Sequence, residues 1–108
     1  RLVGSEMCIR DRYWGQPRYY EDWPWLSGDL ATRLASCGLK GVGLDTPSLD
    51  GFNGRCAHDL CAAAGMENLE NLANLGELPT RGFSVLALPL KLAATEASPV
   101  RAVALFDR

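Results

Sequence analysis

The chain has 108 residues, of which 47% are apolar and 22% charged, and this is enough for one small globular domain. Its 11 basic and 13 acidic residues give a net charge of −2, so it lacks the basic field with which proteins attract nucleic acid. The longest apolar run, residues 85–90, is far shorter than the roughly 20 residues that span a bilayer, and the N-terminus has no hydrophobic signal region. We therefore expect neither nucleic acid nor a membrane as a partner.

The four cysteines, Cys8, Cys37, Cys56 and Cys61, are irregularly spaced and form no CxxC pair. This spacing does not indicate a disulfide framework, because the apolar content suffices for a core without covalent cross-links. We expect reduced thiols in a cytoplasmic protein.

Residues 2–12 read Leu-Val-Gly-Ser-Glu-Met-Cys-Ile-Arg-Asp-Arg and show no helical or strand periodicity. They resemble the in-frame translation of a transposase-based sequencing adapter. The alternative is an ordinary disordered N-terminal tail. We expect residues 1–12 to be an adapter-derived artefact that is excluded from fold reasoning, and residues 13–108 to be native, with upstream protein missing before Tyr13.

The first native elements are an aromatic segment and a helix. Residues 13–25 hold three Trp, three Tyr and two Pro with poor periodicity, which predicts an irregular loop whose aromatics pack on a neighbour or line a pocket. Ser27 is a typical N-cap, and Leu30 and Leu34 then repeat at helical spacing. With Gly38 at the position after the helix, this pattern predicts a helix over residues 28–37.

The remaining elements alternate between strand and helix. We predict a short buried strand over residues 41–44, a loop over 46–54, and a helix over 55–64 that Gly65 stops. Leucines 69, 72 and 75 fit either a helix or a short strand. Residues 83–88 predict a central strand, 93–99 a loop and 100–106 a last strand. The fold class is therefore α/β.

His58 is the only histidine, and Glu70 follows it by twelve residues. If the helix and the segment after Gly65 bring them to one end of the sheet, imidazole and carboxylate would suit Zn²⁺, Mn²⁺ or Fe²⁺. Two protein ligands do not complete a catalytic site, since three plus a water is the usual set. A lone histidine on a helix is also often only structural.

Other residues support weaker hypotheses. Asp45 and Asp50 flank a loop at the carboxyl end of a strand, where α/β proteins place their sites, and Ser48 lies between them. The same residue types are also those that tight turns use. Cys56, His58 and Cys61 could form part of a small zinc-binding module, or the cysteines could be apolar fillers. Exposed tryptophans, Trp14, Trp23 and Trp25, would indicate a protein-binding module.

Four blocks stand out in the order of the chain: Gly43-Leu44-Asp45-Thr46-Pro47-Ser48-Leu49-Asp50, His58-Asp59-Leu60 with Glu70-Asn71-Leu72-Ala73-Asn74-Leu75, Ala87-Leu88-Pro89-Leu90-Lys91-Leu92, and Ala97-Ser98-Pro99-Val100-Arg101-Ala102-Val103-Ala104. Together they resemble the cyclase family of metal-dependent hydrolases, which includes arylformamidase-like enzymes (kynurenine formamidase-like). The resemblance covers about residues 14–106. It implies the C-terminal part of a cyclase-like domain of the swivelling β/β/α type, with a strand over residues 69–71.

The resemblance also implies a function. His58 and Glu70 would be metal ligands, most simply for Zn²⁺ with Mn²⁺ as the alternative, while Asp45 and Ser48 would contact a small-molecule amide substrate. The whole protein would hydrolyse an aryl formamide similar to N-formylkynurenine, or a related amide, and would form a homodimer or higher oligomer. The family's proximal block, His-x-Gly-Thr-His-x-Asp-x-Pro, is absent from these 108 residues. We therefore expect this chain alone to be inactive and marginally stable, with open strand edges.

Overall fold

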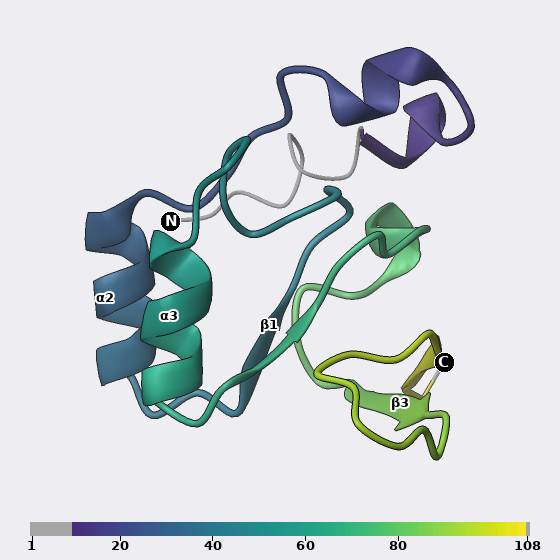
Figure 1. Cartoon of the computed structure of the whole chain (residues 1–108). Helices are drawn as coiled ribbons and strands as arrows, with labels where there is room; N and C mark the ends of the chain where they lie inside the picture. Colours follow the sequence, from purple (N-terminus) through teal and green to yellow (C-terminus); the bar gives the residue numbers. More distant parts are fainter. Residues whose placement is uncertain (1–9, 108) are drawn as a thin grey trace. The chain divides into compact units, whose positions relative to one another are not determined.

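A computed structural model of the chain describes residues 10–107, which fall into two compact units. The first unit ends at Gly76 and the second begins at Glu77 (Figure 1). The first unit combines helices with parallel strands, and the second is an antiparallel hairpin, so the predicted mixture of helix and strand is confirmed. Within the described residues, no helix is long and apolar enough to cross a membrane.

The aromatic segment at the start of the first unit contains two short 3₁₀ helices, η1 (Arg10–Tyr13) and η2 (Pro17–Tyr20), where we expected only irregular loop. Pro17 sits at the first position of η2, where its fixed φ suits a helical turn and its missing N–H is no loss. Residues 10–12 of the predicted adapter lie in η1, and the adapter hypothesis itself stays a prediction.

Helix α2 (Gly28–Ser36) confirms the predicted helix to within one residue. The Ser27 side chain accepts a hydrogen bond from the Leu30 amide at 3.2 Å, so it caps the helix as its sequence position predicts. Gly38 follows in the left-handed region, with φ of 67°, and ends the helix there.

Strand β1 (Gly41–Gly43), helix α3 (Cys56–Ala63) and strand β2 (Glu67–Leu69) form a βαβ unit. The two strands are parallel, with Gly41 opposite Glu67 and Gly43 opposite Leu69. Backbone hydrogen bonds continue the pairing beyond the strands, since the Leu72 amide bonds to the Leu44 carbonyl at 3.0 Å. This pairing positions the segments that leave the two strands side by side.

Strand β2 lies two residues earlier than the predicted strand over residues 69–71. The reason is local: Gly65 stops α3 with φ of 66°, and the chain enters the sheet at once, with the Glu67 amide bonding to the Lys40 carbonyl at 3.0 Å. Asn71 then takes a positive φ of 57° and ends the extended segment. Glu70 consequently stands just after β2 and not within it.

The core of the first unit lies among α2, α3 and the two strands that α3 connects, β1 and β2. Helices α2 and α3 pack side by side (Figure 1). Its buried side chains come from both helices, from the residues just before α2 and β2, and from the loop after β1. They are Leu26, Ala31, Leu44, Leu49, Ala57, Cys61 and Met66. Burying a leucine of this kind contributes about 1.5–3 kcal/mol. Leu49 belongs to this core, and its burial fixes the loop after β1 in which it lies.

The second unit is a hairpin of β3 (Ser84–Pro89) and β4 (Val100–Leu105). Alternation along the strands places large apolar side chains on one face and small ones on the other. The first face, the large-residue face, carries Leu86, Leu88, Val103 and Leu105 together with Ser84 and Arg101 at its ends, and the second carries Val85, Ala87, Pro89, Val100, Ala102 and Ala104. The second face is apolar throughout and the first is mostly apolar, as in a strand covered on two sides.

The prediction that residues 83–88 form a buried central strand is wrong for this structure. Among residues 10–107, strand β3 pairs only with β4, and Leu88 is 69% exposed. The sequence pattern reports what the strand is suited to contact, whereas burial requires a partner that the described residues do not supply. A two-stranded hairpin of this kind is marginally stable in water by itself.

We expect the chain to self-associate through the large-residue face, because removing exposed apolar surface from water lowers the free energy. The double substitution Leu88→Lys with Leu105→Lys should weaken association by at least about 10-fold, since each leucine contributes about 1.5–3 kcal/mol on burial. Sedimentation velocity over a concentration series measures this. A control with Ala93→Lys and Ala97→Lys adds the same charge in the loop between the strands and should have little effect. A chain that is monomeric at every concentration would contradict the prediction.

Candidate functional site

The polar residues of the first unit gather at one end of the βαβ unit. Parallel strands direct their carboxyl ends to the same edge, and the helix that connects them begins at that edge. The loop after β1, the first turn of α3 and the residue after β2 therefore meet, and they bring together Asp50, His58 and Glu70. Convergence of His58 with Glu70 is the arrangement that the sequence predicted.

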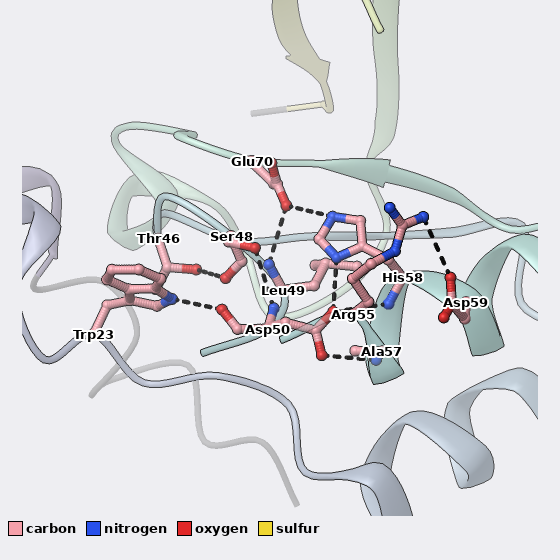
Figure 2. Close-up of polar contacts among 10 residues, drawn as sticks. All are labelled: Trp23, Thr46, Ser48, Leu49, Asp50, Arg55, Ala57, His58, Asp59 and Glu70. Atoms are coloured by element: carbon pink, nitrogen blue, oxygen red, sulfur yellow. Dashed lines mark hydrogen bonds and ion pairs between the residues drawn. The ribbon is translucent and has the colours of Figure 1, made fainter. Parts of the chain in front are cut away.

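The imidazole of His58 lies between two carboxylates (Figure 2). Its Nδ1 is 2.7 Å from Asp50 Oδ2, and its Nε2 is 3.0 Å from Glu70 Oε1. The side chain of His58 is 35% exposed and that of Glu70 25%, so solvent and small molecules reach the pair. Both ring nitrogens are thus occupied by acidic partners.

Asp50 is buried and accepts hydrogen bonds from three donors. Its Oδ1 accepts from the Ala57 amide at 2.8 Å, and its Oδ2 accepts from the His58 amide at 3.0 Å and faces the His58 ring. Burial alone would raise the pKa of Asp50, but these amides and the His58 ring outweigh burial and lower the pKa below its usual range. Asp50 therefore caps α3, whose N-cap residue Arg55 makes no side-chain cap bond.

Glu70 is held from the same loop. Its Oε1 accepts the Leu49 amide at 3.0 Å and also faces His58 Nε2. A carboxylate oxygen is an acceptor, so at this separation Nε2 either donates its own proton to Oε1 or shares a bound cation with it. The donor set of one imidazole nitrogen and one carboxylate oxygen fits a borderline divalent cation such as Zn²⁺.

Within the described residues, neither Asp45 nor Ser48 forms a hydrogen bond with this pair. Asp45 is 1% exposed, and its Oδ2 accepts the Arg10 amide at 3.0 Å. Burial raises the pKa of Asp45, and within the described part of the chain its Oδ1 has no hydrogen-bond partner. The Ser48 hydroxyl accepts the Asp50 amide at 3.2 Å, which is turn chemistry. A role of either residue in substrate binding stays a prediction.

Tyr19 contacts the loop that contains Asp45 through its hydroxyl. Its hydroxyl lies 3.0 Å from the Asp45 carbonyl oxygen and 2.9 Å from Asn71 Oδ1, so it links the segments that follow β1 and β2. Burial, with a smaller effect of Asp45, raises the pKa of Tyr19 to about 12. The neutral phenol is therefore a structural donor that buttresses the loop.

The alternative zinc module is not formed. Cys61 is fully buried in the core, whereas Cys56 is exposed at the start of α3. Among residues 10–107, no three side chains of His, Cys, Asp or Glu are grouped so that they could hold a metal ion. Cys61 is better explained as the apolar filler that the sequence also allowed.

The tryptophans divide between structural and exposed positions. Trp23 is buried, and its Nε1 donates to the Asp50 carbonyl at 2.9 Å, so this side chain supports the loop (Figure 2). Trp25 and Trp14 are 58% and 62% exposed. The hypothesis of a protein-binding module that uses all three tryptophans is therefore wrong for Trp23.

Sequence reasoning missed two groups, the Asp50 carboxylate as the partner of His58 and the Leu49 amide as the partner of Glu70. Asp50 was considered as a site residue or a turn residue but not as the partner of His58, because it stands six positions before α3 and outside any local capping pattern. The available signal was the position itself: an acidic residue between a strand and the helix that follows it can reach the free amides of that helix.

No protein-family model matches the chain, but individual relatives do. Over 77 residues the chain is 43% identical to a protein named kynurenine formamidase from Paracidovorax citrulli (strain AAC00-1), a match that covers 69% of this chain and 35% of that protein. It is 42% identical over 73 residues to the kynurenine formamidase of Delftia acidovorans (strain DSM 14801 / SPH-1), covering 66% of this chain and 34% of that one. The chain thus spans about a third of the length of the curated relatives it matches.

A solved structure described as a potential metal-dependent hydrolase with cyclase activity superimposes on the chain with a TM-score of 0.67 and 32% sequence identity. The match covers 86% of this chain and 48% of that one. These similarities confirm the predicted resemblance and the cyclase-like α/β fold. The stretch matched in Paracidovorax spans 69% of 108 residues, so it must include the centre of the chain with His58 and Glu70.

We predict that Cys61 resists alkylation by iodoacetamide, because burial and, to a smaller degree, Asp50 raise the pKa of its thiol and the core excludes the reagent. Cys37 and Cys56 are exposed and serve as internal controls. Peptide mass spectrometry over time should show Cys61 modified about 100-fold more slowly, at the rate of local opening. Equal rates for Cys56 and Cys61 would restore the zinc-module hypothesis.

Proposed function

We propose that this homologue of kynurenine formamidases is part of a metal-dependent hydrolase of the cyclase family. The whole protein would cleave the C–N bond of a small aryl formamide, of the kind that N-formylkynurenine represents, or of a related amide. The observation that carries the proposal is the approach of His58 Nε2 to Glu70 Oε1 at 3.0 Å, in a chain whose relatives are named for formamide hydrolysis.

His58 and Glu70 would provide two ligands of the metal centre. The donors are of the type that Zn²⁺ accepts, and both side chains are partly open to solvent. His58 is held through Nδ1 by Asp50, and Glu70 is held through Oε1 by the Leu49 amide. When bound, a divalent cation would supply Lewis acidity that polarises a carbonyl and makes water a better nucleophile near neutral pH. Glu70 would contribute the anionic donor and His58 the neutral one.

The remaining ligands would lie outside these 108 residues. A catalytic zinc site normally uses three protein ligands and keeps one open position, so a pair is insufficient. The resemblance implies that a His-x-Gly-Thr-His-x-Asp-x-Pro block supplies the others together with the group that moves the proton. Residues 13–108 would then be the C-terminal part of the domain, which agrees with a chain that spans about a third of its relatives' length.

Asp45 and Ser48 enter the proposal only as supports of the loop that reaches substrate. Asp45 is buried behind Tyr19, and Ser48 orients the Asp50 amide. These contacts favour shaping of the site over direct recognition of the amide.

A metal titration tests the ligand pair in this chain. Zn²⁺ should bind weakly and at 1:1, and His58→Ala or Glu70→Gln should reduce the affinity by at least about 10-fold, because each removes one of two donors. Isothermal calorimetry measures this. Cys56→Ser is the matched control on the same helix turn and should leave binding unchanged. A large loss of affinity in Cys56→Ser would contradict the assignment.

A hybrid enzyme tests the activity. The stretch of this chain that matches the Paracidovorax citrulli protein replaces its counterpart there, and hydrolysis of N-formylkynurenine is followed by product absorbance. We expect an active hybrid, in which His58→Ala lowers kcat/KM by about 100-fold or more, beyond the 10- to 100-fold range typical of supporting residues. A folded, metal-loaded hybrid that hydrolyses no aryl formamide would count against the proposed substrate class.

A further inference from the structure

We propose that Asp50 is the positioning residue of the site: it holds the His58 ring with hydrogen on Nδ1, so that the Nε2 lone pair is directed at the place where Glu70 Oε1 approaches. The tautomer follows from contacts within this chain. Only its purpose, the binding of a cation between Nε2 and Oε1, rests on the proposed function.

The Asp50 carboxylate accepts hydrogen bonds through both of its oxygens. It is almost completely buried, and its two oxygens accept the amides of Ala57 and His58 at 2.8 and 3.0 Å. Both oxygens are therefore acceptors, and Oδ2 accepts again from the atom that faces it at 2.7 Å, His58 Nδ1. An ionised carboxylate has no hydrogen to give, so Nδ1 donates to it. Glu70 Oε1 faces Nε2 in the same way at 3.0 Å, but the Asp50 contact is shorter and the Asp50 side chain is 4% exposed against 25% for Glu70. In a ring that carries one proton, the shorter and more buried contact with Asp50 therefore holds that proton on Nδ1.

The second step is the fixed orientation of the carboxylate. Oδ1 accepts the Ala57 amide and Oδ2 accepts the His58 amide, and both amides belong to the first turn of α3. The start of the helix therefore fixes the plane of the carboxylate. The backbone of Asp50 is tied as well, since its carbonyl accepts Trp23 Nε1 at 2.9 Å and its amide donates to the Ser48 hydroxyl at 3.2 Å. Asp50 is thus held at both carboxylate oxygens and at two backbone atoms, so it orients the ring more firmly than a free side chain would.

The third step is the neighbouring residue. The Leu49 amide donates to Glu70 Oε1 at 3.0 Å, and the Leu49 side chain is fully buried in the core. Two consecutive residues thus orient the two halves of the pair, Leu49 acting on Glu70 and Asp50 on His58.

The fourth step is the close packing behind Asp50. A Cβ added at Gly54 would lie 3.0 Å from Asp50 Cβ and 3.0 Å from the Gly51 carbonyl oxygen, both tighter than ordinary contact. Gly54→Ala would consequently push the Asp50 side chain without altering its charge or its carboxylate. This gives a second way to disturb the positioning.

The experiment is NMR on the 108-residue chain, in which His58 is the only histidine and its ring nitrogens give the only imidazole signals. Long-range ¹H–¹⁵N spectra are recorded at about pH 9, where ordinary histidine rings are neutral. We expect the proton on Nδ1, which is the reverse of the tautomer that free histidine side chains prefer in water. A ring with its proton on Nε2 overturns the proposal.

The variant Asp50→Asn tests the cause. An amide at this position can give a hydrogen to Nδ1, so the tautomer should invert to Nε2–H, as an aspartate-to-asparagine exchange beside a histidine can do without loss of geometry. Asp59→Asn is the matched control: it removes the same charge from the same helix, but Asp59 is exposed and contacts only Arg55, at 3.6 Å. An unchanged tautomer in Asp50→Asn overturns the proposal.

Zn²⁺ titration followed by the same ring signals separates this proposal from the proposed function. We expect Asp50→Asn to weaken Zn²⁺ binding by about 10- to 100-fold, with a smaller loss in Gly54→Ala and none in Asp59→Asn. A chain with the Nδ1–H tautomer that binds no Zn²⁺ supports the positioning role and counts against the metal centre. Zn²⁺ binding that is equal in wild type and Asp50→Asn overturns the positioning role while the metal centre stands. The wild-type spectrum decides the tautomer even if Asp50→Asn does not fold.

Discussion

The hydrogen bonds of one buried carboxylate connect the parts of the first unit that matter for its chemistry. Asp50 joins the loop after β1 to the start of α3 and to the His58 ring, and Trp23 holds it from behind. Burying a charge without partners costs several kcal/mol, but three N–H donors and the positive end of a helix offset that cost here. Removal of the carboxylate would leave those amides unsatisfied and the ring free to turn, so stability and orientation depend on the same group.

The same contacts determine the charge of the site. His58 stands between two carboxylates, and within the described chain no Lys or Arg side chain forms an ion pair with this trio. Two negative groups around one imidazole create a local field that favours a cation, although the chain as a whole is only mildly acidic. Asp50 is almost completely buried and its oxygens are used within the fold, whereas His58 and Glu70 are partly open to solvent. Under the proposed function, His58 Nε2 and Glu70 would be the ligands and Asp50 the support of the His58 ring.

Several features were predictable because they depend on neighbours in sequence. The caps of α2 at Ser27 and Gly38, and the meeting of His58 with Glu70, follow from spacing and from the geometry of a βαβ unit. The Asp50 contact was not predictable from pattern, because the eight-residue separation crosses a loop with Asn53 at φ of 61°. The start of β2 was misplaced because evenly spaced leucines fit two structures equally. The burial of β3 was overestimated, since periodicity shows what a strand can contact and not whether the partner is present.

The hairpin and the metal pair share a physical property, namely that each is built for more contacts than these residues provide. The hairpin has two mostly apolar faces, whereas a stable two-stranded sheet needs at least one covered. The metal pair has two donors, whereas a catalytic site needs three. Neither deficit explains the other, because the hairpin could be covered by any apolar surface, while the metal pair requires specific donors at fixed positions. Under the proposed function both deficits have one source: further chain of the same domain would supply the covering layer and the remaining ligands, and the chain covers 48% of a structurally similar hydrolase.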